Sequence, residues 1–144
     1  MALGFGGARV LNLSDPFTAL LVVLTILQVK HAICDYPLQS LYQLQNKGTY
    51  GHPGGFLHAG LHIVGTATVF LAVTPTFWLG AAILIGEFVF HYHVDWAKDK
   101  WIRARGFTPV DREFWWAIGF DQLLHHLSYI VIAAVLVGVM VGTT

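Results

Sequence analysis

Four pairs of potential metal ligands recur along this chain with a spacing of four residues, and each pair lies in or beside a long apolar run. The pairs are His31/Asp35, His58/His62, His91/Asp95 and Asp121/His125. Residues i and i+4 lie on the same face of an α-helix, so both members of a pair can bind one ion. Imidazole and carboxylate ligands suit zinc, iron, manganese or nickel, and the single cysteine argues against a thiolate cluster. The sequence therefore predicts a metal centre built from eight side chains.

Eight ligands are more than the four that one tetrahedral ion needs, so we expect two ions. Zinc is the first expectation for these divalent ions, with iron or manganese as alternatives. One ion surrounded by residues that orient its ligands would also account for the set. A buried, hydrogen-bonded polar cluster without metal is the remaining interpretation.

Three further residues are assigned to catalysis. Glu87 precedes His91 by four residues and lies about 6 Å deeper along the helix, where it is expected as a deeper ligand or as the partner that orients an imidazole. Lys47 and Lys98 are expected near the same membrane surface, where their ammonium groups would hold a phosphate as point charges.

The composition places these residues in a membrane protein. Of 144 residues, 56% are hydrophobic and 11% are charged, against about 25% charged in ordinary soluble domains. Apolar runs of about 18 residues or more are long enough to cross a bilayer, and four are present: 16–34, 56–73, 77–96 and 114–141. We expect an all-α, integral membrane four-helix up-down bundle that forms one domain over residues 1–144. The first run is expected to be retained, because no small-residue cleavage site follows it.

The distribution of Lys and Arg orients the bundle. The segments between the first two and the last two runs carry the basic residues, which include Lys47 and the group Lys98, Lys100, Arg103, Arg105 and Arg112. Basic loops face the cytoplasm, so both termini are expected outside. Since consecutive runs alternate in direction, all four ligand pairs should meet at the cytoplasmic surface. Residues 37–55 read as an amphipathic segment that lies on the membrane.

The other polar residues receive simpler interpretations. His52, His93 and His126 are expected as interfacial anchors, since they lie in a loop or off the ligand-bearing helix faces. Lys30 is expected to extend its ammonium group to the interface. Three glutamines are assigned either to ligand orientation or to loop packing: Gln28, Gln39 and Gln122.

The motifs together resemble those of the bacterial membrane family catalogued as domain of unknown function 3307. In this sequence they are His-x-x-x-Asp-Tyr-x-Leu-Gln (31–39), Lys47, His-x-x-x-His (58–62), His-x-x-x-Asp-x-x-Lys (91–98) and Asp-Gln-x-x-His (121–125). The resemblance extends over about residues 20–137. It implies a small helical protein of the bacterial inner (cytoplasmic) membrane, and it brings no established activity.

The first functional hypothesis is a metal-dependent hydrolase that acts on a lipid phosphate or isoprenyl phosphate. The repeated His-x-x-x-Asp steps are similar to the multi-zinc layer of the helical phospholipase C and P1 nuclease enzymes. One metal would lower the pKa of its water towards ~7 while another polarises a phosphoryl oxygen. The expected partners are membrane lipids and a lipid-phosphate substrate, and not nucleic acid.

Two alternatives stay open. A di-iron lipid oxidase or hydroxylase fits the ligand types, although His125–His126 is the only adjacent histidine pair. A non-enzymatic metal-binding or proton-conducting subunit of a larger membrane complex is the other. The outer halves of the runs offer few polar groups for a conducting path, chiefly Thr25, Thr66 and Thr68. A homo-oligomer is likewise left open.

Overall fold

The structure is a computed structural model that describes residues 12–142, and these residues form helices without any strand. The elements are α1 (Pro16–Asp35), α2 (Leu41–Asn46), α3 (Pro53–Ala67), the 3-10 turn η1 (Thr68–Leu71), α4 (Phe77–Arg105) and α5 (Arg112–Gly142). Four helices are long and apolar enough to cross a membrane: α1, α3 continued by η1, α4 and α5. The predicted fold class is confirmed.

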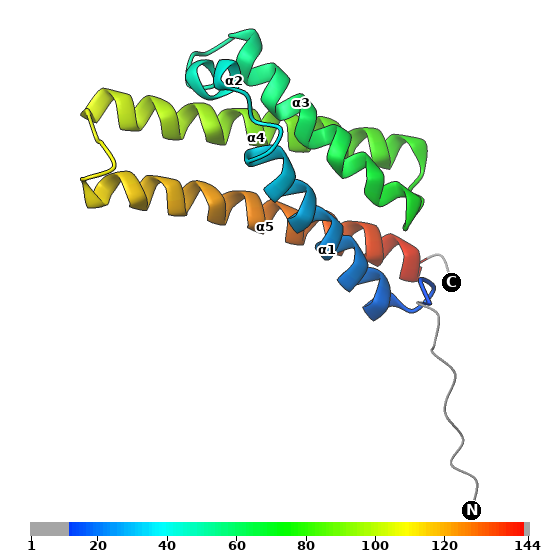
Figure 1. Cartoon of the computed structure of the whole chain (residues 1–144). Helices are drawn as coiled ribbons and strands as arrows, with labels where there is room; N and C mark the ends of the chain where they lie inside the picture. The colour runs from blue at the N-terminus through cyan, green and yellow to red at the C-terminus, as the bar shows by residue number, and fades with distance from the viewer. Residues whose placement is uncertain (1–11, 143–144) are drawn as a thin grey trace, which may run out of the picture.

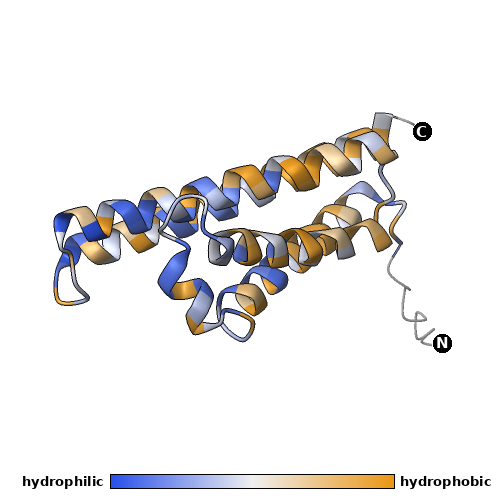
Figure 2. Ribbon diagram, turned by 90° about the horizontal axis from the view of Figure 1, so that it is seen from above, coloured by the Kyte–Doolittle hydropathy of each residue, from blue (hydrophilic) through white to orange (hydrophobic). Residues whose placement is uncertain are grey.

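The long helices run alternately up and down (Figure 1). α4 and α5 form a long hairpin whose connecting end projects beyond the other helices, and α1 and α3 pack against it and against each other. The short α2 packs on α3. Hydrophobic residues gather toward the end of the bundle where α1 begins and α5 ends, and hydrophilic residues gather toward the opposite end (Figure 2). The bundle is therefore divided along its length into an apolar half and a polar half.

Local signals in the sequence fix where the helices begin and end. Asp15 caps α1 by accepting a hydrogen bond from the Thr18 N–H at 2.8 Å, and Pro16 occupies the first helical position. Thr76 caps α4 in the same way. Gly106 ends α4 in the left-handed conformation, with φ 66°, which a glycine adopts at low cost. These caps set the register of the inward-facing side chains.

Two predicted boundaries differ from the structure. α4 continues from the predicted end at residue 96 to Arg105, because the charged residues there end the apolar run but do not break a helix before Gly106. The second crossing segment begins at Pro53 and ends at Leu71, whereas the apolar run suggested 56–73. The first and last segments agree with the predicted ranges to within two residues.

The apolar core and the polar cluster are successive sections of the same helix faces. On α1 the buried positions Ala19, Val23 and Leu27 lead directly to His31 at steps of four residues. On α5 an equivalent stripe runs from Asp121 through His125 and Tyr129 into apolar residues. The core of the apolar half contains Ala19, Val23, Leu27, Val69, Tyr129, Ala133 and Leu136. Helix packing that buries this core therefore also carries the polar side chains into the bundle interior.

Candidate metal centre

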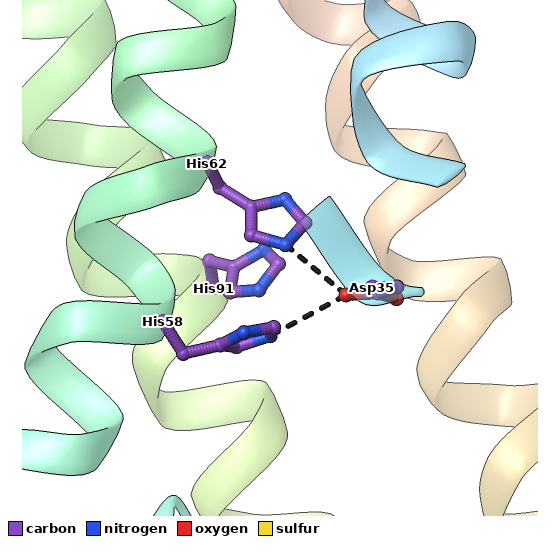
Figure 3. Close-up of side chains that lie close together, drawn as sticks. All are labelled: Asp35, His58, His62 and His91. Carbon is purple, nitrogen blue, oxygen red and sulfur yellow. Dashed lines mark hydrogen bonds and ion pairs between the residues drawn. The ribbon is translucent and has the colours of Figure 1, made fainter. Parts of the chain in front are cut away.

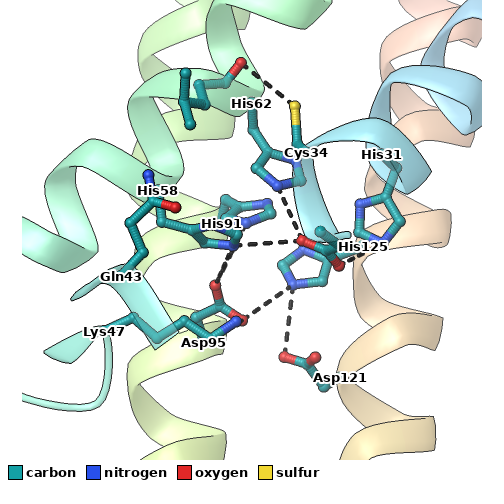
Figure 4. A network of polar contacts seen from close by, with 12 residues as sticks. His31, Cys34, Gln43, Lys47, His58, His62, His91, Asp95, Asp121 and His125 are labelled. Atoms are coloured by element: carbon teal, nitrogen blue, oxygen red, sulfur yellow. Dashed lines mark hydrogen bonds and ion pairs between the residues drawn. The ribbon is translucent and has the colours of Figure 1, made fainter. Parts of the chain in front are cut away.

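The structure brings all eight predicted metal ligands into one layer between α1, α3, α4 and α5 (Figure 4). Seven of them are buried, with at most 4% of their surface exposed: His31, His58, His62, His91, Asp95, Asp121 and His125. The Asp35 side chain is 13% exposed. The four-residue spacing thus predicted correctly which side chains meet.

A first group of four potential ligands comes from three helices and is drawn in Figure 3: Asp35, His58, His62 and His91. One donor atom from each lies within 4.8 Å of the others. Asp35 Oδ1 is 3.1 Å from His62 Nε2 and 3.4 Å from His58 Nε2. Four nitrogen and oxygen donors are the number that a closed tetrahedral zinc site uses.

A second group of three potential ligands lies beside the first and shares one residue with it. His91, Asp95 and His125 also offer donor atoms within 4.8 Å of one another. Asp121 adjoins this group, with its Oδ1 3.5 Å from His125 Nε2. Three protein donors with a free coordination position are typical of catalytic zinc sites.

Several buried polar atoms of these two groups have no hydrogen-bond partner among the described residues. They are both ring nitrogens of His58 and of His91, Asp95 Oδ2, Asp121 Oδ1 and His125 Nδ1. His58 Nε2 lies only 3.1 Å from Asp95 Oδ2, yet the approach lacks hydrogen-bond geometry. An unsatisfied buried polar atom costs about 1–3 kcal/mol. A metal ion would satisfy nitrogen and oxygen atoms that converge without forming hydrogen bonds.

His31 has partners for both of its ring nitrogens, as His62 does, and so differs from His58, His91 and His125. Its Nε2 lies 2.9 Å from Gln122 Oε1 and 3.2 Å from Asp35 Oδ2, and its Nδ1 lies 2.8 Å from the Tyr129 hydroxyl. It is outside both groups of converging donors. The contacts suit a residue that orients the Asp35 carboxylate, and ligation by His31 stays a prediction.

Gln122 and Tyr129 complete the layer, and only the first was considered from the sequence. Gln122 Nε2 donates to Asp35 Oδ2 at 3.4 Å and to Asp121 Oδ2 at 3.3 Å. Tyr129 follows His125 by four residues and so lies on the same helix face, a signal that could have identified it.

Lys47 and Lys98 both point at the second group. Lys98 Nζ lies 3.4 Å from Asp95 Oδ1 and 3.4 Å from Asp121 Oδ2, and Lys47 Nζ lies 3.5 Å from Asp95 Oδ1. Both lysines line a polar pocket of about 360 Å³, whose other lining residues include Asp35, Asp99, Arg103, Asp121 and Gln122. The centre is thus reached through a pocket that carries positively charged groups.

Lys30 is buried, and the prediction that it extends to the interface is wrong. Its Nζ lies 2.5 Å from Glu87 Oε1 and 4.4 Å from the centre of the Tyr129 ring. Glu87 supplies a counter-charge at the same depth, which removes the need to reach water. Gly65 makes room, since a Cβ there would lie 3.2 Å from the Lys30 side chain.

The hydrogen bond of Glu87 goes to Lys30 and not to an imidazole. Lys30 in turn lies 3.4 Å from His62 Nδ1 and donates to the His62 carbonyl oxygen at 3.3 Å. Glu87 is therefore linked to the centre through Lys30. A catalytic role for Glu87 stays a prediction.

The remaining histidines lie outside both groups of donors. His52 caps α3, since its ring accepts a hydrogen bond from the Gly54 N–H at 3.1 Å. His93 is exposed, and its Nδ1 lies 2.6 Å from the Val89 carbonyl oxygen. His126 is partly buried beside the ring of His31.

The comparisons with known proteins concern the family alone. The model of the family described as "Protein of unknown function (DUF3307)" matches residues 23–143, which is most of the chain. Neither a curated protein nor a solved structure is similar enough to this chain to give a match.

Proposed function

For this chain, which belongs to the DUF3307 family, we propose a membrane-integral, metal-dependent hydrolase that acts on a phosphoester at the cytoplasmic membrane surface. The family description assigns no activity, so the proposal rests on the site. The observation that carries it is the convergence of buried ring nitrogens and carboxylate oxygens that have no hydrogen-bond partner within residues 12–142.

Two ions account for the donors better than one. The first ion would be held by Asp35, His58, His62 and His91. The second would be held by Asp95, His125 and Asp121, whose atoms adjoin each other on the side of the polar pocket. The first set is complete and the second leaves a position open. Zinc suits these nitrogen and oxygen donors, with iron or manganese as alternatives.

Metal binding would reverse the charge of the site. With neutral imidazoles, the four carboxylates of the cluster exceed its three lysine ammonium groups by one charge. Two divalent ions would change a net charge of about −1 to about +3. The occupied centre would therefore attract an anion such as a phosphoester.

The chemistry needs an activated water and a stabilised leaving oxygen. Bound metal would lower the pKa of a water towards ~7 and polarise the phosphoryl oxygen. An ion held by these residues would supply an activated water, whose oxygen would bond to phosphorus as the P–O ester bond breaks. The electron pair of that bond would leave with the alcohol oxygen, which would take a proton. Lys47 and Lys98 line the polar pocket and contact the carboxylates of the centre, so their ammonium groups would hold the phosphate oxygens and donate that proton.

The place of the centre in the bundle suits a membrane substrate. The ligands lie at the end of α1, which spans about 30 Å at 1.5 Å rise per residue, close to the thickness of the hydrocarbon core. The polar pocket lies beyond them, where α4 and α5 carry the basic residues. By the positive-inside rule this surface faces the cytoplasm.

A proton-conducting subunit is the weaker alternative. Beneath the centre, the Lys30–Glu87 pair extends the polar layer by about one helical turn. The described residues next along the bundle are the apolar core, with Leu27, Val69 and Leu136 almost fully buried. A water-filled path toward the opposite surface is therefore not supported. A di-iron oxidase is distinguished from the hydrolase by the metal that the protein contains.

The test is phosphate release from p-nitrophenyl phosphate by protein purified in detergent. We expect hydrolysis that chelator abolishes and zinc restores, and that Asp95→Asn removes. Asp15→Asn is the matched control, since asparagine preserves the helix cap far from the centre. Fully metal-loaded protein that releases no phosphate would contradict the proposal.

A further inference from the structure

A long apolar groove runs between α4 and α5 and ends at the polar pocket. Its volume is about 950 Å³, at the upper end of the range for ligand sites. Most of its lining is apolar, and includes Val89, Phe90, Ala97, Trp101, Trp116 and Phe120. Lys98 and Asp121 line it as well, and both also line the polar pocket.

The groove continues toward the opposite end of the bundle. A second apolar groove between the same helices has a volume of about 430 Å³ and shares Phe90 and Leu124 with the first. On α4 the two together extend from Ala82 to Trp101, which is about 28 Å at 1.5 Å rise per residue. The length is close to that of the hydrocarbon core, so an extended chain parallel to the helices would fit.

One end of the groove is polar and the other is apolar, which matches the polar head and the hydrocarbon chain of a lipid. Trp101 and Trp116 lie at the polar end and are 43% and 59% exposed, as suits indole groups at the headgroup level. Lys98 lies near them, and its ammonium group contacts Asp95 and Asp121 of the candidate metal centre. The other end, around Ala82 and Val135, is apolar. A molecule in the groove would thus place an anionic head at Lys98 and a hydrocarbon chain along α4 and α5.

We propose that the groove between α4 and α5 binds the hydrocarbon chain of a lipid phosphate and presents its phosphate to the metal centre through Lys98. Presentation of the phosphate to the metal centre rests on the function proposed above. Binding of the hydrocarbon chain in the groove does not depend on that function. The apolar groove between α1 and α3 provides an internal comparison. Its volume is about 450 Å³, and it shares no lining residue with the polar pocket.

Ala97 is the position at which the groove can be closed. It is exposed in the groove next to Lys98. A phenylalanine there would occupy the space beside the phosphate-binding end. Ala104 is an exposed alanine on the same helix that lies outside the described grooves, so Ala104→Phe is the matched control.

The experiment is photolabelling with hexadecyl phosphate that carries a diazirine in its chain, using the full chain in phosphatidylcholine nanodiscs. We expect labelled peptides from 82–101 and 116–135, which line the two continuous grooves between α4 and α5, and little label on α1 and α3. Excess unlabelled hexadecyl phosphate should prevent this labelling. Ala97→Phe should lower it by about tenfold, while Ala104→Phe should not.

Uniform labelling of all four long helices would overturn the proposal. Equal labelling of the α4–α5 groove and the α1–α3 groove would overturn it as well. The wild-type labelling pattern decides this even if Ala97→Phe fails to fold. Metal content is measured on the same samples. Labelling of the α4–α5 groove in protein that holds no metal would support binding of the lipid chain and would contradict the proposed hydrolase function. Metal-loaded protein without labelling of this groove would contradict binding of the lipid chain and would not affect the proposed hydrolase function.

Discussion

The imidazole rings of His62 and His91 have their centroids 3.8 Å apart, although one comes from α3 and the other from α4. The ring of His125 on α5 lies 4.1 Å from His91 on its other side. Imidazolium groups at these distances would repel one another, and neutral imidazole is the form that binds a metal. His91 thus stands between the two groups of donors and belongs to both.

The central position of His91 predicts how metal content responds to substitution. His91→Ala should lower the content of the first ion, because it removes one of the four donors of that ion, and should weaken the second, because His91 also lies in the second group of converging donors. His58→Ala should lower the content of the first ion alone, and His125→Ala should lower the content of the second ion alone. Elemental analysis of the purified variants measures the effect. His52→Asn should retain the wild-type content, since asparagine preserves the cap of α3 outside the centre; equal contents in all four variants would argue against the two-ion assignment.

The buried Lys30–Glu87 pair predicts a large effect on stability. Glu87→Gln removes one charge of a pair whose side chains are 6% and 1% exposed, leaving the other buried without a counter-charge. Such a change costs about 3–5 kcal/mol. Thermal unfolding in detergent should show the loss.

Replacing both members of this pair tests the reason for that loss. Lys30→Met combined with Glu87→Met should recover most of the stability, because no unpaired charge remains. A double variant as unstable as Glu87→Gln would mean that the pair does more than balance charge.

Lys98 should act on the phosphate rather than on the metal. Its ammonium group contacts Asp95 and Asp121 at 3.4 Å, and it lines both the polar pocket and the α4–α5 groove. Lys98→Met should weaken inhibition by inorganic phosphate by about tenfold while the metal content stays at the wild-type level. Loss of metal in this variant would assign Lys98 to the integrity of the centre instead.

Removal of the metal should destabilise the protein and should become easier as the pH falls. Metal that binds the folded chain adds to its stability. Because ligand imidazoles and carboxylates must be deprotonated, protons compete with the ion, so the apparent affinity should decrease with decreasing pH. Melting temperatures with and without chelator at a series of pH values test both effects. A melting temperature that chelator does not change would contradict stabilisation by metal.

The sequence predicts that these side chains converge, because their spacing follows helical periodicity. The spacing of four places Asp121 and His125 on the face of α5 that also carries Tyr129 and Ala133, and burial of this face carries the ligands inward. Apolar runs were enough to find the four crossing helices. The end of α4 at Arg105 was missed because hydropathy marks where a helix leaves the apolar layer and not where it stops.

Contacts between helices were harder to predict. The position of Lys30 on its helix suggests a residue near the membrane interface. Its burial depends on two residues of other helices, Glu87 as the counter-charge and Gly65 for space. His31 has the same spacing as a ligand, yet the contacts that occupy its nitrogens come from Gln122 and Tyr129 on α5. A single sequence does not reveal such pairings, because they depend on the relative rotation and depth of two helices.

The most direct test of the metal centre is the metal content of the wild-type protein, purified without added metal and then equilibrated with zinc and desalted. We expect about two ions per chain, with nitrogen and oxygen ligands and no sulfur in the X-ray absorption spectrum. Folded protein that retains no zinc, iron or manganese under these conditions would contradict it.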